Sequence, residues 1–281
     1  MKLVTWNTQW CRGIDGTVSP ERIVAGARKL ADFDVLCLQE ISVNYPGLAG
    51  NPGHDQPALL RELLPGFQLF FGAAVDEFGA DGQRRQFGNV IATRLPVAQV
   101  QHHALPYPAD GGVRSMPRMC TVVTVKDPAL GPVRVMTTHL EYYSKKQRMA
   151  QARALRDLHV QACAQADAPP QPSDDGSPFQ TKVHTSSAIL CGDFNLASTE
   201  PEYPALTEPS DEGRLWDAWR LLHGEAPQPP TFHVHDKTYS DTPVACDFVF
   251  VSEGLEDRLR RMEIDEATQA SDHQPVMVTL R

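Results

Sequence analysis

Short apolar runs alternate with a few helix-periodic stretches along the whole chain. Runs rich in β-branched residues predict strands. These predicted strands cover residues 3–5, 35–39, 67–71, 89–93, 97–101, 120–125, 133–138, 188–191, 248–251 and 276–280. Apolar positions at helical spacing predict three helices, over residues 21–32, 57–64 and 143–166. Many strands with few helices favour two packed sheets with helices outside over a doubly wound parallel sheet.

Three segments are rich in glycine, proline or aspartate and predict loops: residues 44–56, 73–86 and 167–180. The composition of the third is also typical of a linker, but the strands on either side of it continue one pattern. We therefore expect a single domain over residues 1–281, with a surface loop insertion at about residues 167–187. A chain of this length buries enough surface to fold without disulfides.

The net charge is −9, which argues against tight binding to long duplex DNA, because such proteins carry a basic face. It leaves open a local basic patch, or bound metal ions that supply positive charge. The six cysteines contain no CxxC pair, and most lie in or beside apolar runs, as is typical of buried reduced thiols. The sequence shows no signal peptide and no apolar stretch of membrane-spanning length. We expect a soluble, cytoplasmic monomer.

Acidic, amide and imidazole side chains recur where predicted strands begin or end. They are Asn7, Glu40, His139, Asp193, Asn195, Asp247, Asp272 and His273. Each alone has a structural explanation, as a turn cap, a loop carboxylate or a hydrogen-bonded histidine. As a set they supply hard oxygen ligands for Mg²⁺ or Mn²⁺ and two imidazoles for proton transfer or phosphate binding. The sequence has no thiolate-rich pattern typical of a Zn²⁺ site.

Six short blocks of sequence carry a resemblance to a known family. They are Trp6-Asn7, Leu38-Gln39-Glu40, Thr138-His139-Leu140, Gly192-Asp193-Phe194-Asn195, Asp247-Phe248-Val249-Phe250 and Ser271-Asp272-His273-Gln274-Pro275-Val276. In this order the blocks resemble the signatures of the endonuclease/exonuclease/phosphatase superfamily, which is DNase I-like. The resemblance implies an α/β fold: a four-layer sandwich of two mixed β-sheets packed face to face, with helices on the outside.

The resemblance also implies a metal site. Glu40, with Asn7, would hold the essential Mg²⁺ or Mn²⁺ ion, and Asp272 would lie at the same site. Some relatives place an acidic residue two positions after the first asparagine, where this chain has Gln9. We therefore expect one firmly bound metal ion rather than two equal ones.

The resemblance further implies a catalytic set around the scissile phosphate. Asp193 would align or activate the attacking water, and Asn195 beside it would contact the phosphate or the metal ion. Asp247 would orient His273 against the phosphate, and His139 would be the second imidazole facing it. The sequence leaves open whether His273 acts as a base or as an electrostatic partner.

Two further residues are candidates for substrate contact. The pair Gly88-Asn89 resembles a family element near the substrate, and Arg118 precedes a predicted strand from which it could reach a phosphate. A turn asparagine and a solvated loop arginine are the alternative interpretations.

The residue set favours metal-assisted hydrolysis, and the resemblance implies a metal-dependent hydrolase that acts on a phosphodiester in the manner of a nuclease, with nucleic acid as a candidate partner. The alternative is a phosphatase or phosphodiesterase for a small molecule or lipid headgroup, resembling inositol phosphatases or sphingomyelinases. A non-catalytic scaffold that kept the fold is a third hypothesis, because fold alone does not prove activity. The central motifs do not separate the first two.

Overall fold

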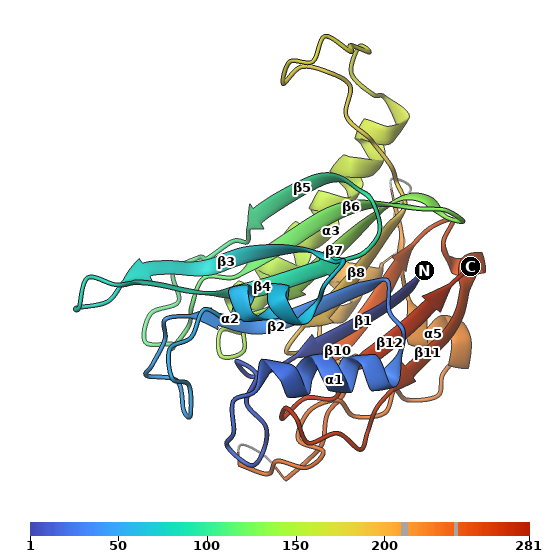
Figure 1. Cartoon of the computed structure of the whole chain (residues 1–281). Helices are drawn as coiled ribbons and strands as arrows, with labels where there is room; N and C mark the ends of the chain where they lie inside the picture. Colours follow the sequence, from blue (N-terminus) through green and yellow to red (C-terminus); the bar gives the residue numbers. More distant parts are fainter. Residues whose placement is uncertain (209–212, 239–240) are drawn as a thin grey trace.

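Two six-stranded sheets dominate the computed structural model, which describes residues 1–208, 213–238 and 241–281 (Figure 1). In spatial order the first sheet contains β11 (Leu259–Ile264), β12 (Val276–Leu280), β1 (Lys2–Asn7), β2 (Val35–Val43), β4 (Arg84–Thr93) and β3 (Gln68–Phe78). The second contains β5 (Val97–Ala104), β6 (Met119–Asp127), β7 (Gly131–His139), β8 (Ala188–Asp193), β10 (Asp247–Ser252) and β9 (Leu215–Asp217). Each sheet has one parallel pair, β1–β2 or β7–β8, and its other neighbours are antiparallel.

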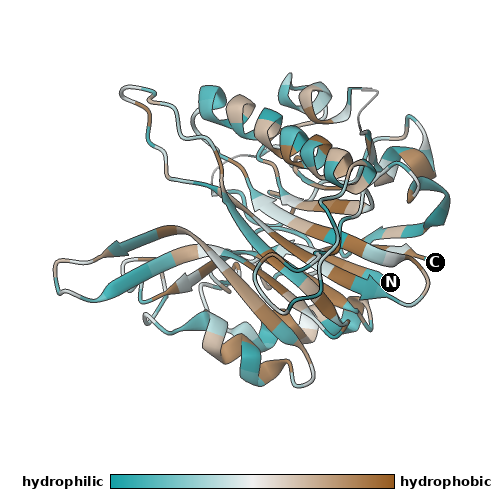
Figure 2. Ribbon diagram, turned by 90° about the horizontal axis from the view of Figure 1, so that it is seen from above, coloured by the Kyte–Doolittle hydropathy of each residue, from teal (hydrophilic) through white to brown (hydrophobic). Residues whose placement is uncertain are grey.

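The central strands carry apolar side chains on both faces. One face of each sheet packs against the other sheet, and the opposite face packs against helices. Leu3 and Val35 from the first sheet join Val135 and Ile189 from the second in the core between the sheets. The intervening residues of the same strands point outward into two further apolar clusters under the helices. Figure 2 shows the hydrophobic positions concentrated on the strands, with hydrophilic positions on the outer sides of the helices.

Helices cover both outer faces and complete the four layers. On the first sheet lie α1 (Pro20–Leu30) and α2 (Gln56–Leu63); on the second lie α3 (Lys145–Asp167) and α4 (Glu202–Thr207). The short α5 (Ala218–His223) packs against β10 and β11, and a 3₁₀ turn, η1 (Glu256–Arg258), precedes β11. Ser19 and Ser144 cap α1 and α3 by accepting hydrogen bonds from backbone N–H groups of the first turn. The predicted fold class is confirmed.

Several local predictions differ from the structure. Residues 73–86 were expected to form a loop, but β3 and β4 extend through most of them as a hairpin, paired from Gln68 opposite Thr93 to Phe78 opposite Arg84. The polar residues there reflect a hairpin whose tip is exposed, rather than a loop. The sequence does not predict β9, β11, α4 and α5. These elements are at most six residues long, and their hydrophobic periodicity is weak.

The segment of residues 168–187 forms an extended loop that projects from the sandwich, in yellow at the top of Figure 1. It joins the end of α3 to the start of β8. Across the described ranges, the helices are all too short or too polar to cross a membrane.

Candidate active site

The ends of the two parallel strand pairs meet at one edge of the sandwich. Asn7 ends β1, His139 ends β7 and Asp193 ends β8, and His139 lies opposite Asp193 in the register. The Asn7 Nδ2 donates to Asp193 Oδ2 at 2.9 Å and to Glu40 Oε1 at 3.1 Å. This amide therefore links the two sheets and gathers two carboxylates at the strand ends.

Glu40 reaches the cluster because β2 is bulged there. The pairing of β2 with β4 shifts register between Leu38 and Ile41, and Glu40 has a φ of +62°. A bulge of this kind re-aims a side chain out of the normal alternation of a strand. Glu40 thereby lies with its Oε1 at 3.8 Å from His139 Nε2, across the gap between the sheets.

Gly192 allows β8 to approach β7 closely just before Asp193. Its φ is +137°, and a Cβ atom added there would lie 2.0 Å from the backbone oxygen of Thr138. Only glycine fits this position without moving the backbone that carries Asp193 and His139. In the resulting geometry His139 Nε2 lies 3.4 Å from Asp193 Oδ2.

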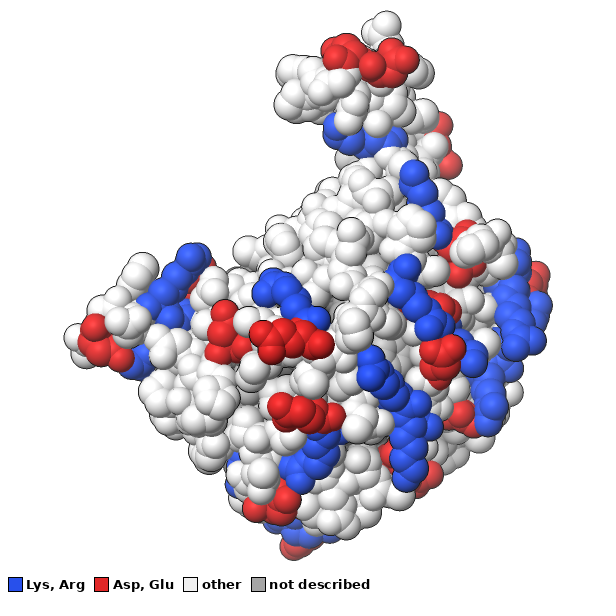
Figure 3. Space-filling view, viewed as in Figure 1, with Lys and Arg blue, Asp and Glu red and all other residues white. Residues whose placement is uncertain are grey.

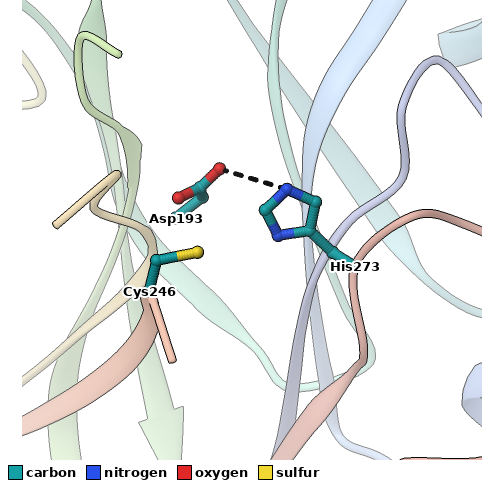
Figure 4. A group of neighbouring side chains, drawn as sticks. All are labelled: Asp193, Cys246 and His273. Atoms are coloured by element: carbon teal, nitrogen blue, oxygen red, sulfur yellow. Dashed lines mark ion pairs between the residues drawn. The ribbon is translucent and has the colours of Figure 1, made fainter. Parts of the chain in front are cut away.

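His273 is fixed from several sides. Its Nδ1 lies 2.9 Å from Asp247 Oδ2 and donates a hydrogen bond to that carboxylate. The Phe232 ring stacks on the imidazole, with centroids 4.3 Å apart, and Trp6 Nε1 donates to the His273 backbone oxygen at 2.9 Å. The opposite nitrogen, Nε2, is left facing the cluster, 3.7 Å from Asp193 Oδ2 (Figure 4).

Asp272 and Asn195 complete the predicted set. Gln9 Nε2 donates to Asp272 Oδ2 at 2.7 Å, and the Ser271 hydroxyl donates to Asp272 Oδ1 at 3.2 Å. Asn195 donates its Nδ2 to the Leu140 backbone oxygen at 2.9 Å and its backbone N–H to the carboxylate of Asp193 at the same distance. The residue that replaces a possible acidic ligand, Gln9, therefore holds Asp272 in place instead.

The carboxylates of this cluster have raised pKa values. Burial, with the nearby charge of Asp272, raises the pKa of Glu40 to about 7. Burial also raises the pKa values of Asp193 and Asp272, and the positive charge of His273 partly offsets this. In the protein without metal these groups therefore resist ionisation, as expected where several carboxylates share one buried site.

The two histidines differ in charge. Burial, with the positive charges of Arg118 and His273, holds the pKa of His139 well below its usual value, so this imidazole is neutral. Burial also lowers the pKa of His273, but the carboxylates of Asp247 and Asp193 outweigh it and raise that pKa well above its usual value. The site thus combines a neutral and a cationic imidazole.

A cavity of about 340 Å³ opens onto this cluster. Its polar wall includes Glu40, Asp193, His273 and Arg118, and its other walls carry aromatic side chains. Those are Trp10, Phe87, Tyr142, Tyr143 and Phe232. Of the two predicted substrate residues, Arg118 lines this cavity. Asn89 is not among the residues that line it: Asn89 lines a small neighbouring pocket that also includes Arg118 and His139, and its Nδ2 donates to the Met119 backbone oxygen at 3.4 Å.

The donor set fits a hard divalent cation. Glu40, Asp193 and Asp272 offer carboxylate oxygens, the ligands that Mg²⁺ and Mn²⁺ prefer. Burial raises the pKa values of all three carboxyl groups, and a bound cation would favour their ionised forms. Asn7 fits less directly, because its amide nitrogen faces the carboxylates while its oxygen accepts from the Gln9 backbone N–H at 3.1 Å.

Three features of the site are not predicted from the sequence. Cys246 was interpreted only as a buried thiol, but it lies against Asp193 and His273. The stacking of Phe232 on His273 and the pairing of Arg118 with Glu141 were also missed. Phe232 comes from a loop without a periodic pattern, so only the position of Cys246, directly before Asp247, offered a signal.

The fold and this cluster define a DNase I-like α/β sandwich with an acidic, histidine-containing site at one end of its facing sheets. A model of the endonuclease/exonuclease/phosphatase family matches residues 4–273. The chain belongs to this family, whose members are metal-dependent phosphoesterases. Among curated protein sequences, none matches the chain.

Solved structures share the whole fold. An endonuclease/exonuclease/phosphatase protein from Beutenbergia cavernae is 26% identical with a TM-score of 0.72, and the match covers 100% of this chain and 71% of that one. A mannosyl-6-phosphatase from Bacteroides thetaiotaomicron is 19% identical with a TM-score of 0.68, covering 100% and 99%. Truncated TDP2 from Caenorhabditis elegans is 16% identical with a TM-score of 0.63, covering 99% and 96%. At 19% and 16% identity, the last two matches show the shared fold alone.

Proposed function

We propose that this chain is a Mg²⁺- or Mn²⁺-dependent hydrolase that cleaves a phosphodiester bond. The observation that carries the proposal is the convergence of Glu40, Asp193 and His273 from both sheets onto one cavity, where the buried amide of Asn7 joins the two carboxylates. A scaffold has no physical need for this many buried ionisable groups in one place, because burying each of them costs stability.

In this proposal the carboxylates of Glu40 and Asp272 hold the cation, with Asn7 beside them. The bound cation would neutralise negative charge on the phosphate ester and its leaving group. Gln9 keeps Asp272 in position, through the 2.7 Å hydrogen bond described above. The proposal includes one metal ion, because this chain has Gln9 where some relatives have an acidic residue that could bind a second ion.

The remaining residues act on water and phosphate. Asp193 accepts a hydrogen bond from the attacking water and aligns it, while Asn195 contacts the phosphate from the same loop. His273, cationic and held by Asp247, stabilises the charge that builds on the phosphate oxygens in the transition state. His139, being neutral, donates one hydrogen bond to the phosphate from the other side. The His273 imidazole is fixed by Asp247 and Phe232 before substrate arrives, so little reorganisation is needed there.

The aromatic walls of the cavity support a substrate with flat groups next to the phosphate. Tyr142 and Tyr143 are about half exposed and meet edge to face, with ring centroids 4.9 Å apart. Aromatic faces of this kind stack on nucleobases without sequence preference. This favours a nuclease-like action on a nucleotide diester, in a short or single-stranded segment.

A small phosphorylated molecule is the second candidate substrate. The face shown in Figure 3 carries lysine and arginine interspersed with acidic residues, rather than a continuous basic stripe, and the net charge of the chain is −9. Both observations disfavour long duplex DNA. A structure of the same fold, at 19% identity, is a mannosyl-6-phosphatase, which adds sugar phosphates to the substrates worth testing.

Hydrolysis of bis-p-nitrophenyl phosphate and of p-nitrophenyl phosphate, with Mg²⁺ or Mn²⁺ and with EDTA, tests the proposal. We expect metal-dependent turnover of the diester that EDTA abolishes and that Glu40→Gln reduces. A panel of oligonucleotides and plasmid DNA, beside sugar phosphates, inositol phosphates and sphingomyelin, then separates the two substrate classes. Turnover of the monoester alone would replace the diester proposal, and no turnover of any ester would leave the scaffold hypothesis.

A further inference from the structure

Cys246 lies against the catalytic cluster in a position that the proposed hydrolysis does not use. It directly precedes Asp247 at the start of β10, and it is 2% exposed. One ligand atom each of Asp193, Cys246 and His273 lies within 4.8 Å of the other two. Figure 4 shows the sulfur atom and the carboxylate both facing the imidazole ring. The three side chains come from β8, from the residue directly before β10 and from the loop before β12.

This donor set differs from that of the rest of the site. Glu40 and Asp272 offer oxygen atoms alone, which suits Mg²⁺ or Mn²⁺. Cys246 and His273 add a sulfur and a nitrogen atom, and the combination with one carboxylate is the one that Zn²⁺ and other thiophilic cations prefer. We call the oxygen donors Glu40 and Asp272 the hard side of the cluster, and the sulfur and nitrogen donors Cys246 and His273 its soft side. Asp193 lies between the two sides.

The soft side can be reached from solvent. A second cavity, of about 360 Å³, is lined by Cys246 and shares Tyr142, Asn195 and Phe232 with the cavity at the carboxylates. The spacing is also within reach, because Zn²⁺ holds its ligand atoms about 3.5 Å apart. From separations of at most 4.8 Å, side-chain adjustments of about 1 Å would bring the three donors onto one ion.

We propose that Asp193, Cys246 and His273 bind a thiophilic divalent cation, of the Zn²⁺ or Cd²⁺ type, and that this ion inhibits the enzyme. Binding forms a metal–sulfur bond to Cys246 and a metal–nitrogen bond to His273; the thiol proton and one proton of the cationic imidazole leave to solvent. The ion withdraws Asp193 from the water and His273 from the phosphate. The binding stands on the geometry alone, whereas the inhibition rests on the proposed function.

Binding is tested with Cd²⁺ on the full chain, stripped with EDTA and then supplied with excess Mg²⁺ to fill the hard side. The readout is the ultraviolet sulfur-to-cadmium charge-transfer band, which needs no turnover. We expect one equivalent of Cd²⁺ to produce the band in the wild type and no band from this site in Cys246→Ser. Cys163→Ser is the matched control, because Cys163 is also buried beside a histidine, His159, at 3.7 Å.

Inhibition is tested with Zn²⁺ against Mg²⁺-supported hydrolysis of bis-p-nitrophenyl phosphate. Measured against its own turnover without Zn²⁺, Cys246→Ser should need more than about tenfold more Zn²⁺ for the same fractional inhibition, because one ligand is lost. An unchanged Cd²⁺ band in Cys246→Ser, or its loss in Cys163→Ser, would overturn the site. A band that depends on Cys246 in a protein without turnover would refute the proposed function alone. Turnover with equal Zn²⁺ sensitivity in both proteins would refute the inhibition alone.

Discussion

Arg118 and Glu141 form a buried ion pair at the wall of the active-site cavity, with Arg118 Nε 3.1 Å from Glu141 Oε2. Glu141 also accepts hydrogen bonds from the backbone N–H groups of Met116 and Tyr143, at 3.2 and 3.0 Å. The Arg118 Nη1 is buried and has no hydrogen-bond partner among the described residues. A buried donor without a partner costs about 1–3 kcal/mol, and a substrate oxygen would remove that cost.

The first prediction concerns Arg118. Arg118→Lys should lower kcat/KM by about 10- to 100-fold, mainly through a higher KM, because a lysine would pair with Glu141 and leave no second donor for the phosphate. Steady-state kinetics on a diester substrate measure the effect. Arg134→Lys is the matched control, since Arg134 is equally buried but lies on β7 five residues before His139, away from the cavity. Equal kinetics for Arg118→Lys and the wild type would remove Arg118 from the substrate site.

The second prediction concerns Glu40 in the protein without metal. Because burial raises the pKa of Glu40 to about 7, the folded chain binds the Glu40 proton more tightly than the unfolded chain does. The stability that Glu40 contributes is therefore complete at acidic pH and is lost as the pH rises through about 7. In EDTA at about pH 8, Glu40→Gln should be more stable than the wild type by about 1–3 kcal/mol.

Urea unfolding measures this difference. At about pH 4, where Glu40 is protonated in the wild type, the two proteins should have nearly equal stability. Added Mn²⁺ should then stabilise the wild type at about pH 8 far more than the variant, because it binds the folded state through Glu40. A variant that is less stable than the wild type in EDTA at alkaline pH would contradict the charge argument.

The third prediction concerns the 2.9 Å contact between Asp247 and His273. Asp247→Asn removes a negative charge, so the pKa of His273 should fall and the alkaline limb of the pH–rate profile should move to lower pH. Turnover should fall about 100-fold or more, because the imidazole also loses its fixed orientation. Kinetics over a pH series provide the measurement. A profile that keeps its shape while turnover falls would indicate a purely structural role for Asp247.

The fourth prediction concerns His159 on α3, away from the active site. Burial, with the charge of Arg134, lowers its pKa to about 4, and Arg134 Nη2 donates to its Nδ1 at 2.8 Å. The unfolded chain therefore binds this proton more readily, and stability is lost as the pH falls from about 6.5 towards 4. The loss between about pH 7 and pH 5 should be about 2 kcal/mol.

His159→Gln should flatten this part of the pH–stability curve, since glutamine keeps an acceptor for Arg134 but does not titrate. Denaturant unfolding at several pH values provides the check. If the variant loses as much stability as the wild type between the same pH values, another group is responsible.

Strand residues were predictable where their side chains are buried on both faces. The run ending at Glu40 and the run ending at Asp193 are apolar and short, and the structure has strands at both places. The hairpin of β3 and β4 was not predictable in this way, because its outer half has exposed and charged residues on both faces. Backbone hydrogen bonds between β3 and β4 hold that half together, and such bonds do not require an alternating pattern of apolar and polar residues in the sequence.

The sequence predicted part of the residue set at the candidate site, but not the contacts within it. The motif blocks named Asn7, Glu40, Asp193 and His273, and the structure brings these four together. The partner that each side chain would find depends on bulges, loops and the spacing of the sheets. That Cys246 lies beside His273 depends on such long-range geometry, which local patterns do not encode.

The projecting loop at residues 168–187 separates β7 and its partner β8 in the chain, although the two strands are hydrogen-bonded neighbours. A protease cut in this loop would divide the polypeptide into two pieces, each carrying part of both sheets and part of the acidic cluster. Backbone pairing and the shared core would be all that kept the pieces joined. Turnover by the nicked protein would then serve as a direct assay of their non-covalent reassociation.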